Sequence, residues 1–243
     1  MNLKRIIIVC ILCLMAVSMS QHANAQDQRF RFGLKFSGNL SWIAPATKNI
    51  ESSGNGFGVS YGVMGDYNFQ EYYSLSTELI FTTMAGGIKH TDLLKYTSDS
   101  TPTRSYQDIE YDYTFKYIQI PVSIKFKTKE MGYITYWAQF GLAPSFLIEA
   151  KADLTGRTPF DDPSEIRVNK QINDQYHFDN FDDKVFFARM PLIIGAGIEY
   201  SLSGNTSLYT GLRIDNNFLT IFNADEFTSA KNHYVGLNVG VFF

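Results

Sequence analysis

The chain has 243 residues, of which 45% are hydrophobic and 19% charged, and its formal net charge is −3. No basic tract is present, so a nucleic-acid partner is not expected. Both cysteines, Cys10 and Cys13, precede residue 26, so the rest of the chain has no disulfide, thiolate metal site or cysteine nucleophile.

The first 25 residues have the three parts of a secretory signal peptide: basic residues, an apolar stretch over 6–17 and an Ala-x-Ala site that ends at Ala25. This pattern predicts cleavage between Ala25 and Gln26. A lipoprotein signal modified at Cys13 is the alternative, but Cys13 would divide the apolar region. Cleavage removes two basic residues and leaves 21 − 2 = 19 basic against 24 acidic residues, a net charge of −5.

The segment that follows, residues 29–42, alternates strictly between apolar and polar positions. Every even position from Phe30 to Trp42 is apolar, aromatic or glycine, and the odd positions include Arg31 and Lys35. Side chains alternate across a β-strand with a period of two. The segment is therefore predicted to be a strand with one lipid-compatible face.

Seven further segments repeat this alternation, at 57–69, 73–85, 113–127, 133–149, 185–200, 206–217 and 233–243. No stretch after the signal is apolar for 18 residues, so a transmembrane helix is not expected. Eight strands is an even number, as in closed bacterial membrane barrels. We therefore predict an all-β fold for residues 26–243, an eight-stranded antiparallel transmembrane up-and-down β-barrel.

The predicted connections alternate between short and long. Those at 70–72, 128–132 and 202–205 are tight, whereas those at 43–56, 86–112, 150–184 and 218–232 are long and polar. Outer-membrane barrels have short periplasmic turns and longer external loops. This predicts a barrel in the cell outer membrane, with both termini in the periplasm and four long extracellular loops.

The more polar face of the strands carries ten charges, five of each sign. A charge on the lipid face costs about 2 to 4 kcal/mol for Arg or Lys at the midplane, so these residues are predicted to point into the lumen. A soluble barrel would have the opposite arrangement, with an apolar interior. We expect a charge network that plugs the lumen, in preference to an ion path, formed by Arg31, Lys35, Asp66, Glu78, Lys125, Glu149, Arg189, Glu199, Arg213 and Asp215.

Two prolines, Pro121 and Pro144, lie within predicted strands, where proline removes a ladder hydrogen bond. In a closed barrel this predicts a bulge or a bend near the rim. The loop at 150–184 is rich in acidic residues and could bind calcium, but its spacing matches no calcium loop, so we expect a solvated acidic loop. Its phenylalanines suggest a partner-docking surface or a lid.

A catalytic site is not expected. The histidines after the signal are His90, His177 and His233, all in or beside predicted outer loops. A membrane enzyme active at the outer rim would need one of them close to a nucleophile or an activated water. Ser229 near His233 and the acids near His177 do not form a triad by spacing alone. We therefore predict no catalytic residues, metal ligands or cofactors.

Three segments resemble the PorT-type outer-membrane barrels of Bacteroidetes: Tyr-Ile-Gln-Ile-Pro-Val at 117–122 with Lys125 and Phe126, Gly-Ala-Gly-Ile-Glu-Tyr at 195–200, and Val-Gly-Val-Phe-Phe at 239–243. The namesake of that family is similar in length and layout. The resemblance implies an accessory role in type IX secretion, the export of proteins with C-terminal sorting domains such as secreted proteases. Phe243 also resembles the terminal aromatic signal read by the barrel assembly machinery.

The sequence thus predicts a non-enzymatic outer-membrane component of type IX protein secretion. A barrel of eight strands has an interior just wide enough for side chains, so it would act beside a larger pore. The expected partners are outer-membrane lipid, the assembly machinery and other secretion proteins. A surface adhesion barrel is the main alternative, and a rim-active outer-membrane enzyme is the third.

Overall fold

The structure, a computed structural model, describes residues 29–46, 50–90, 94–98, 101–157, 186–221 and 229–243. No helix in these ranges is long and apolar enough to cross a membrane. The strands are β1 (Phe30–Pro45), β2 (Ile50–Gln70), β3 (Tyr73–His90), β4 (Leu94–Ser98), β5 (Thr101–Gln119), β6 (Val122–Lys127), β7 (Ile134–Leu142), β8 (Ser145–Arg157), β9 (Ala188–Arg189), β10 (Pro191–Ser203), β11 (Thr206–Asn217) and β12 (Ala230–Phe242).

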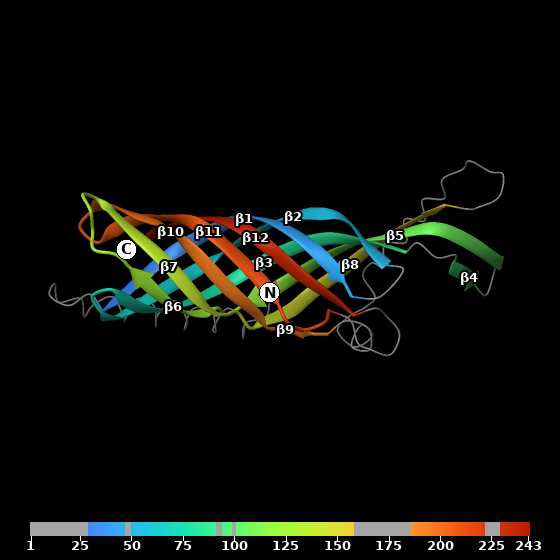
Figure 1. The fold of residues 1–243 in the computed structure, drawn as a ribbon, viewed down its shortest axis with the longest axis horizontal. Helices are drawn as coiled ribbons and strands as arrows, with labels where there is room; N and C mark the ends of the chain where they lie inside the picture. The colour runs from blue at the N-terminus through green and yellow to red at the C-terminus, as the bar shows by residue number, and fades with distance from the viewer. Residues whose placement is uncertain (1–28, 47–49, 91–93, 99–100, 158–185, 222–228) are drawn as a thin grey trace, which may run out of the picture.

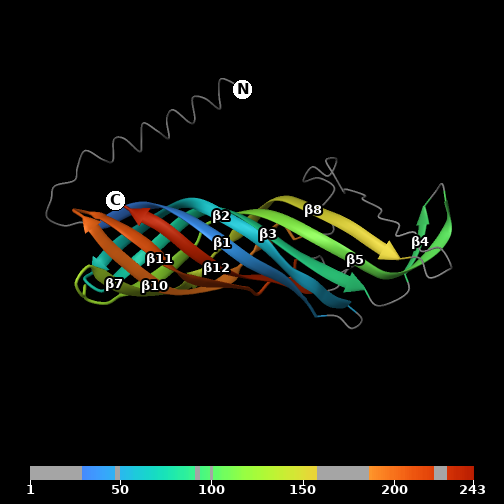
Figure 2. The same ribbon diagram turned by 90° about the horizontal axis from the view of Figure 1, so that it is seen from above.

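Hydrogen bonding closes these strands into an eight-stranded antiparallel ring, which confirms the predicted fold. The first strand, β1, pairs with the last strand, β12, as well as with β2. Three of the eight barrel strands consist of two segments each: β5 with β6, β7 with β8, and β9 with β10. The strands are tilted against the long axis of the barrel, and β12 lies beside β1 in both views (Figures 1 and 2).

A proline lies at each of the three interruptions. The residue opposite donates its backbone N–H to the proline carbonyl, from Glu78 to Pro121 (3.0 Å), from Ile120 to Pro144 (2.9 Å) and from Ala143 to Pro191 (3.0 Å). Proline has no N–H, so each of these pairs lacks the return bond of an antiparallel ladder. The predicted bulge or bend near the rim is therefore wrong. The strands are instead interrupted at the prolines and resume after them, and the three interruptions lie on neighbouring strands.

The two faces of the strands separate as the alternation predicted. The outward face carries exposed apolar side chains, among them Phe32 (58% exposed) and Phe36 (55% exposed) on β1, while Lys35 and Ser37 on either side of Phe36 are buried. The same holds on β11, where Leu212 and Ile214 are exposed and Arg213 is buried. An apolar exterior around a polar interior is the arrangement of a membrane barrel.

Both the beginning of β1 and the end of β12 lie at one end of the ring, here called the near end. The connections at this end are short, as predicted: β2 and β3 are joined through residues 71–72, and β10 and β11 through Gly204 and Asn205. Gly204 has a φ of 57° and Gly132, in the turn before β7, has a φ of 70°. Both are left-handed conformations that favour glycine.

At the opposite end, the far end, the strands continue into the regions predicted as loops. β1 and β2 run into 43–56, β3 and β5 run into 86–112, β8 runs into 150–184, and β12 begins at Ala230 inside 218–232. The predicted loop boundaries are therefore wrong, because strand pairing continues beyond the outward-facing apolar residues, here called the apolar belt. The outermost pairs are His90 with Ile109 and Gln107 with Arg157. Strands β5 and β8, with β4, project beyond the other strands (Figures 1 and 2).

Several predicted features lie outside the described residues. They include the signal peptide at 1–25, the cleavage site between Ala25 and Gln26, and residues 158–185 and 222–228 of two predicted loops.

Candidate functional site: the charged interior

The barrel interior brings together nine of the ten predicted lumen residues, in three groups along the axis. Their positions follow from the alternation, because each lies on the inward face of its strand. Four cations and four carboxylates of this set are buried, and Arg31 is partly buried.

The group at the near end contains Arg31, Lys125, Asp66 and Glu199. Arg31 contacts Glu199 at 2.6 Å and Asp66 at 3.4 Å, and Lys125 contacts the same two carboxylates at 2.6 and 2.9 Å. Lys127, which the sequence analysis left out of the network, lies 3.4 Å from Asp66. The alternation that places Lys125 inward also places Lys127 inward, and this signal could have identified it.

The middle group consists of Lys35, Glu78 and Arg213. One oxygen of Glu78, Oε2, accepts hydrogen bonds from Lys35 Nζ at 2.8 Å and from Arg213 Nη1 at 2.9 Å. The three side chains come from β1, β3 and β11 and are no more than 3% exposed. The contacts therefore cross the lumen and tie distant parts of the ring together.

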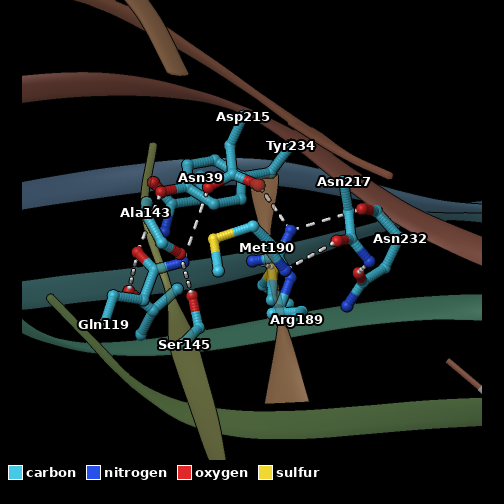
Figure 3. A network of polar contacts seen from close by, with 12 residues as sticks. Asn39, Gln119, Ala143, Ser145, Arg189, Met190, Asp215, Asn217, Asn232 and Tyr234 are labelled. Atoms are coloured by element: carbon cyan, nitrogen blue, oxygen red, sulfur yellow. Dashed lines mark hydrogen bonds and ion pairs between the residues drawn. The ribbon is translucent and has the colours of Figure 1, made fainter. Parts of the chain in front are cut away.

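The third group surrounds Arg189, which donates a short hydrogen bond to Asp215 and another to the carbonyl of Asn232 at 3.3 Å (Figure 3). Gln119 extends the network, since its Nε2 lies 3.5 Å from Asp215 and its Oε1 accepts from Tyr234 at 3.2 Å. These uncharged members were not predicted, because only charged residues marked the network in the sequence. Their inward register was the available signal.

Aromatic residues fill the interior next to the charges. At the near end, Trp137 stacks on Tyr209 with ring centroids 4.7 Å apart, and Phe242 meets Tyr209 edge-on. Lys125 Nζ lies 4.7 Å from the Phe242 ring, a cation–π contact. Gly211 leaves room for Trp137, because a Cβ at that position would lie 2.4 Å from the Trp137 Cζ2.

Toward the far end, an apolar cluster is packed inside the ring and comprises Ile43, Met84, Ile88, Phe115, Tyr117, Ile221, Ala230 and Tyr234. The guanidinium of Arg189 lies 5.4 Å from the Tyr117 ring, so this cluster adjoins the third polar group. Charges and aromatic side chains therefore occupy the interior from the near end to this cluster.

Glu149 does not belong to the lumen network, which corrects its predicted position. Ile148 is an extra residue in β8, because Lys116 pairs with Glu149 while Tyr117 pairs with Leu147. This bulge reverses the faces beyond it. Glu149 is consequently 35% exposed and forms ion pairs with Lys116 at 2.5 Å and Lys151 at 2.8 Å.

With Glu149 removed and Lys127 added, the interior network no longer has equal numbers of each sign. It has six cations, Arg31, Lys35, Lys125, Lys127, Arg189 and Arg213, and four carboxylates, Asp66, Glu78, Glu199 and Asp215. The expected balance of five and five is therefore wrong for the part of the chain that the structure describes.

The remaining candidate residues lie on the outside or beyond the described side chains. Phe243 follows β12, is 59% exposed and donates its backbone N–H to Phe32 at 2.8 Å. His233 faces outward on β12 and lies beside Trp42, with ring centroids 5.8 Å apart. The side chain of His90 and all of His177 lie outside the described part. Within the described ranges, no group of three or more His, Cys, Asp or Glu residues is placed to hold a metal.

Comparisons with known proteins agree with this architecture. A family model described as "Outer membrane protein beta-barrel domain" matches residues 19–222. No curated protein matches the chain.

Among solved structures, the chain is similar to Neisserial surface protein A, with 15% identity, coverage of 87% of this chain and 95% of that chain, and a TM-score of 0.43. It is also similar to Ail, the attachment invasion locus protein of Yersinia pestis (12% identity, 88% and 99% coverage, TM-score 0.39). A third similar structure is the outer membrane protein OprG from Pseudomonas aeruginosa (9% identity, 88% and 95% coverage, TM-score 0.44).

Proposed function

The chain belongs to the outer-membrane β-barrel domain family, and from this premise we propose that it is a non-enzymatic accessory component of type IX protein secretion. The proposal assigns it to the PorT-type barrels of Bacteroidetes, whose motifs its segments at 117–122, 195–200 and 239–243 resemble. These segments form barrel wall on β5 and the start of β6, on β10 and on β12, and they supply Gln119 and Glu199 to the interior network.

The filled interior is the observation that carries the accessory role. Lys35, Glu78 and Arg213 meet across the lumen, and the aromatic cluster around Trp137 lies next to them. A barrel of eight strands holds little more than its own side chains. A folded protein cannot pass such an interior, so a contribution to secretion must come from contacts with a larger pore or from its assembly.

The orientation follows from the same proposal. Both chain ends of the barrel lie at the near end, where the connections are short, and we assign this end to the periplasm. The paired far ends of β2, β3, β5 and β8 then extend toward the outside of the cell. The proposed partners are outer-membrane lipid, the barrel assembly machinery through Phe243, and other secretion proteins.

Deletion of the gene tests the export role. Proteins that carry C-terminal sorting domains, such as secreted proteases, should then accumulate in the periplasm, and a plasmid copy should restore them to the cell surface and the medium. Normal secretion in the deletion strain would contradict the role. Loss of an unrelated outer-membrane protein in the same strain would show a general assembly defect instead.

The non-enzymatic part of the proposal has its own test. A triple replacement of His90, His177 and His233 by glutamine should restore secretion in the deletion strain as fully as the unmodified chain. Failure of the triple variant, at normal abundance in the outer membrane, would indicate that a histidine takes part in function.

A surface-interaction barrel is the second candidate, because pairing among β2, β3, β5 and β8 continues past the apolar belt. Removing residues 91–100, between the pairing partners His90 and Ile109, shortens this projection. If surface contact is the function, the shortened chain should lose cell adherence and keep secretion intact. If the projection instead docks the secretion machinery, the shortened chain should lose secretion and keep cell adherence.

A further inference from the structure

Two buried cations in the middle of the lumen share a single carboxylate oxygen. Lys35 Nζ and Arg213 Nη1 both donate to Glu78 Oε2, at 2.8 and 2.9 Å, and their side chains are 2% and 1% exposed. A buried charge is costly unless it is paired. One carboxylate cannot neutralise two cations, so one positive charge remains at this level of the barrel.

The other carboxylates of the network are already engaged with other cations. Asp66 and Glu199 contact Arg31 and Lys125, which lie toward the near end. Asp215 is the acceptor of Arg189. Asp215 also acts on Arg213 electrostatically, but Lys35, Arg189 and Arg213 then share two carboxylates, so one positive charge is left over in this part of the described interior.

Hydrogen-bond donors are also in surplus at the same place. Nε and Nη2 of Arg213 and Nε2 of Gln139 are buried and have no partner in the described part of the chain. Leaving such a group unsatisfied costs about 1 to 3 kcal/mol, and more for a charged group. All three atoms are donors, so the group that would satisfy them is an acceptor.

The strand register places these donors around one glycine. Gly195 pairs with Arg213 on β11 and with Gln139 on β7, so the two side chains flank a position that has no side chain. A Cβ on Gly195 would lie 3.3 Å from Gln139 Nε2, so the amide leans over the glycine. The Gln139 side chain therefore covers the inward side of Gly195, and Arg213 lies beside that position on the neighbouring strand.

We propose that Arg213 and Gln139 bind a small monovalent anion, of the size of chloride, on the inner side of Gly195. Such an ion neutralises the surplus charge and accepts from the unpartnered N–H groups in one step. The surplus positive charge excludes a cation from this position. A water molecule would accept hydrogen bonds from the N–H groups, but it would not neutralise the positive charge. This site is independent of the proposed export role.

The variant Gln139→Glu tests the site, because it supplies a carboxylate of nearly the same shape where the anion is proposed to bind. The measurement is the thermal unfolding midpoint of the refolded full chain in detergent, in sodium chloride and in sodium gluconate at equal ionic strength. The unmodified chain should have a higher midpoint in chloride, rising with its concentration. Gln139→Glu should have a raised midpoint in gluconate and no further response to chloride.

Gln119→Glu is the matched control, since it makes the same change in the same lumen. Gln119 lies 3.5 Å from Asp215 through its Nε2, so a carboxylate there meets a carboxylate. This variant should have a lower midpoint in both salts and should keep the chloride response. A chloride response that persists unchanged in Gln139→Glu would overturn the proposed site.

Diffraction from crystals of the unmodified chain grown in bromide locates the ion directly, and it decides the proposal even where a variant fails to fold. An anomalous peak between Arg213 and the Gln139 amide is the expected result. Bromide at surface positions only, together with equal midpoints in chloride and gluconate, would overturn the proposal.

Discussion

At the scale of single residues, the ion pair between Arg189 and Asp215 should determine how strongly substitutions in the third polar group lower the free energy of unfolding. Both side chains are at most 2% exposed. Removing one partner of a buried ion pair leaves the other charge uncompensated and costs about 3 to 5 kcal/mol. Asp215→Asn should lower the free energy of unfolding, measured by urea titration in lipid vesicles, by that amount. Adding Arg189→Met should recover most of the loss.

Glu149 provides the control, because its ion pairs with Lys116 and Lys151 lie on the outside at 35% to 47% exposure. Exposed pairs contribute about 0 to 1 kcal/mol, so Glu149→Gln should have a small effect. Equal losses in Asp215→Asn and Glu149→Gln would contradict the division into interior and exterior charges. The alternation of the sequence predicted Asp215 correctly. It could not predict Glu149, because one extra residue at Ile148 reverses the faces beyond it.

At the scale of the strands, the proline interruptions create carbonyls that need other donors. Pro191 cannot donate to the carbonyl of Ala143, and the Ser145 hydroxyl donates to it instead at 2.7 Å (Figure 3). Ser145→Ala should therefore cost about 1 to 3 kcal/mol in the free energy of unfolding. The same change in a Pro191→Ala background should cost much less, because alanine supplies the missing backbone N–H.

Ser207 is the matched control for this cycle, since it is a buried serine whose hydroxyl has no partner among the described residues. Ser207→Ala should be nearly neutral in both backgrounds. A cost of Ser145→Ala that is the same with Pro191 and with alanine would show that the hydroxyl does not replace the ladder bond. Pro121 and Pro144 marked an irregularity in the sequence, but only the three-dimensional register shows that they and Pro191 form a series across adjacent strands.

At the scale of the whole molecule, the sequence was sufficient for the eight-stranded ring, its two faces and its short turns. The reason is physical, since a period of two and a lipid exterior constrain every strand in the same way. The inner contacts were less predictable. Which carboxylate meets which cation depends on strand register and tilt, so the sharing of Glu78 by Lys35 and Arg213 could not be read from spacing. The lengths of the strands at the far end were underestimated, because the paired residues beyond the apolar belt are polar and their sequence resembles that of a loop.

The filled interior is the central claim, and single-channel recording in planar lipid bilayers tests it most directly. The refolded chain, with its folding checked by a heat-dependent shift in gel mobility, should insert and produce no discrete conductance steps. The network from Arg31 to Asp215 and the cluster around Trp137 fill the described interior with side chains, so no continuous water-filled path for ion flow is expected. Sustained conductance steps, reproducible between preparations and absent when the protein is omitted, would contradict a filled barrel and the accessory role that rests on it.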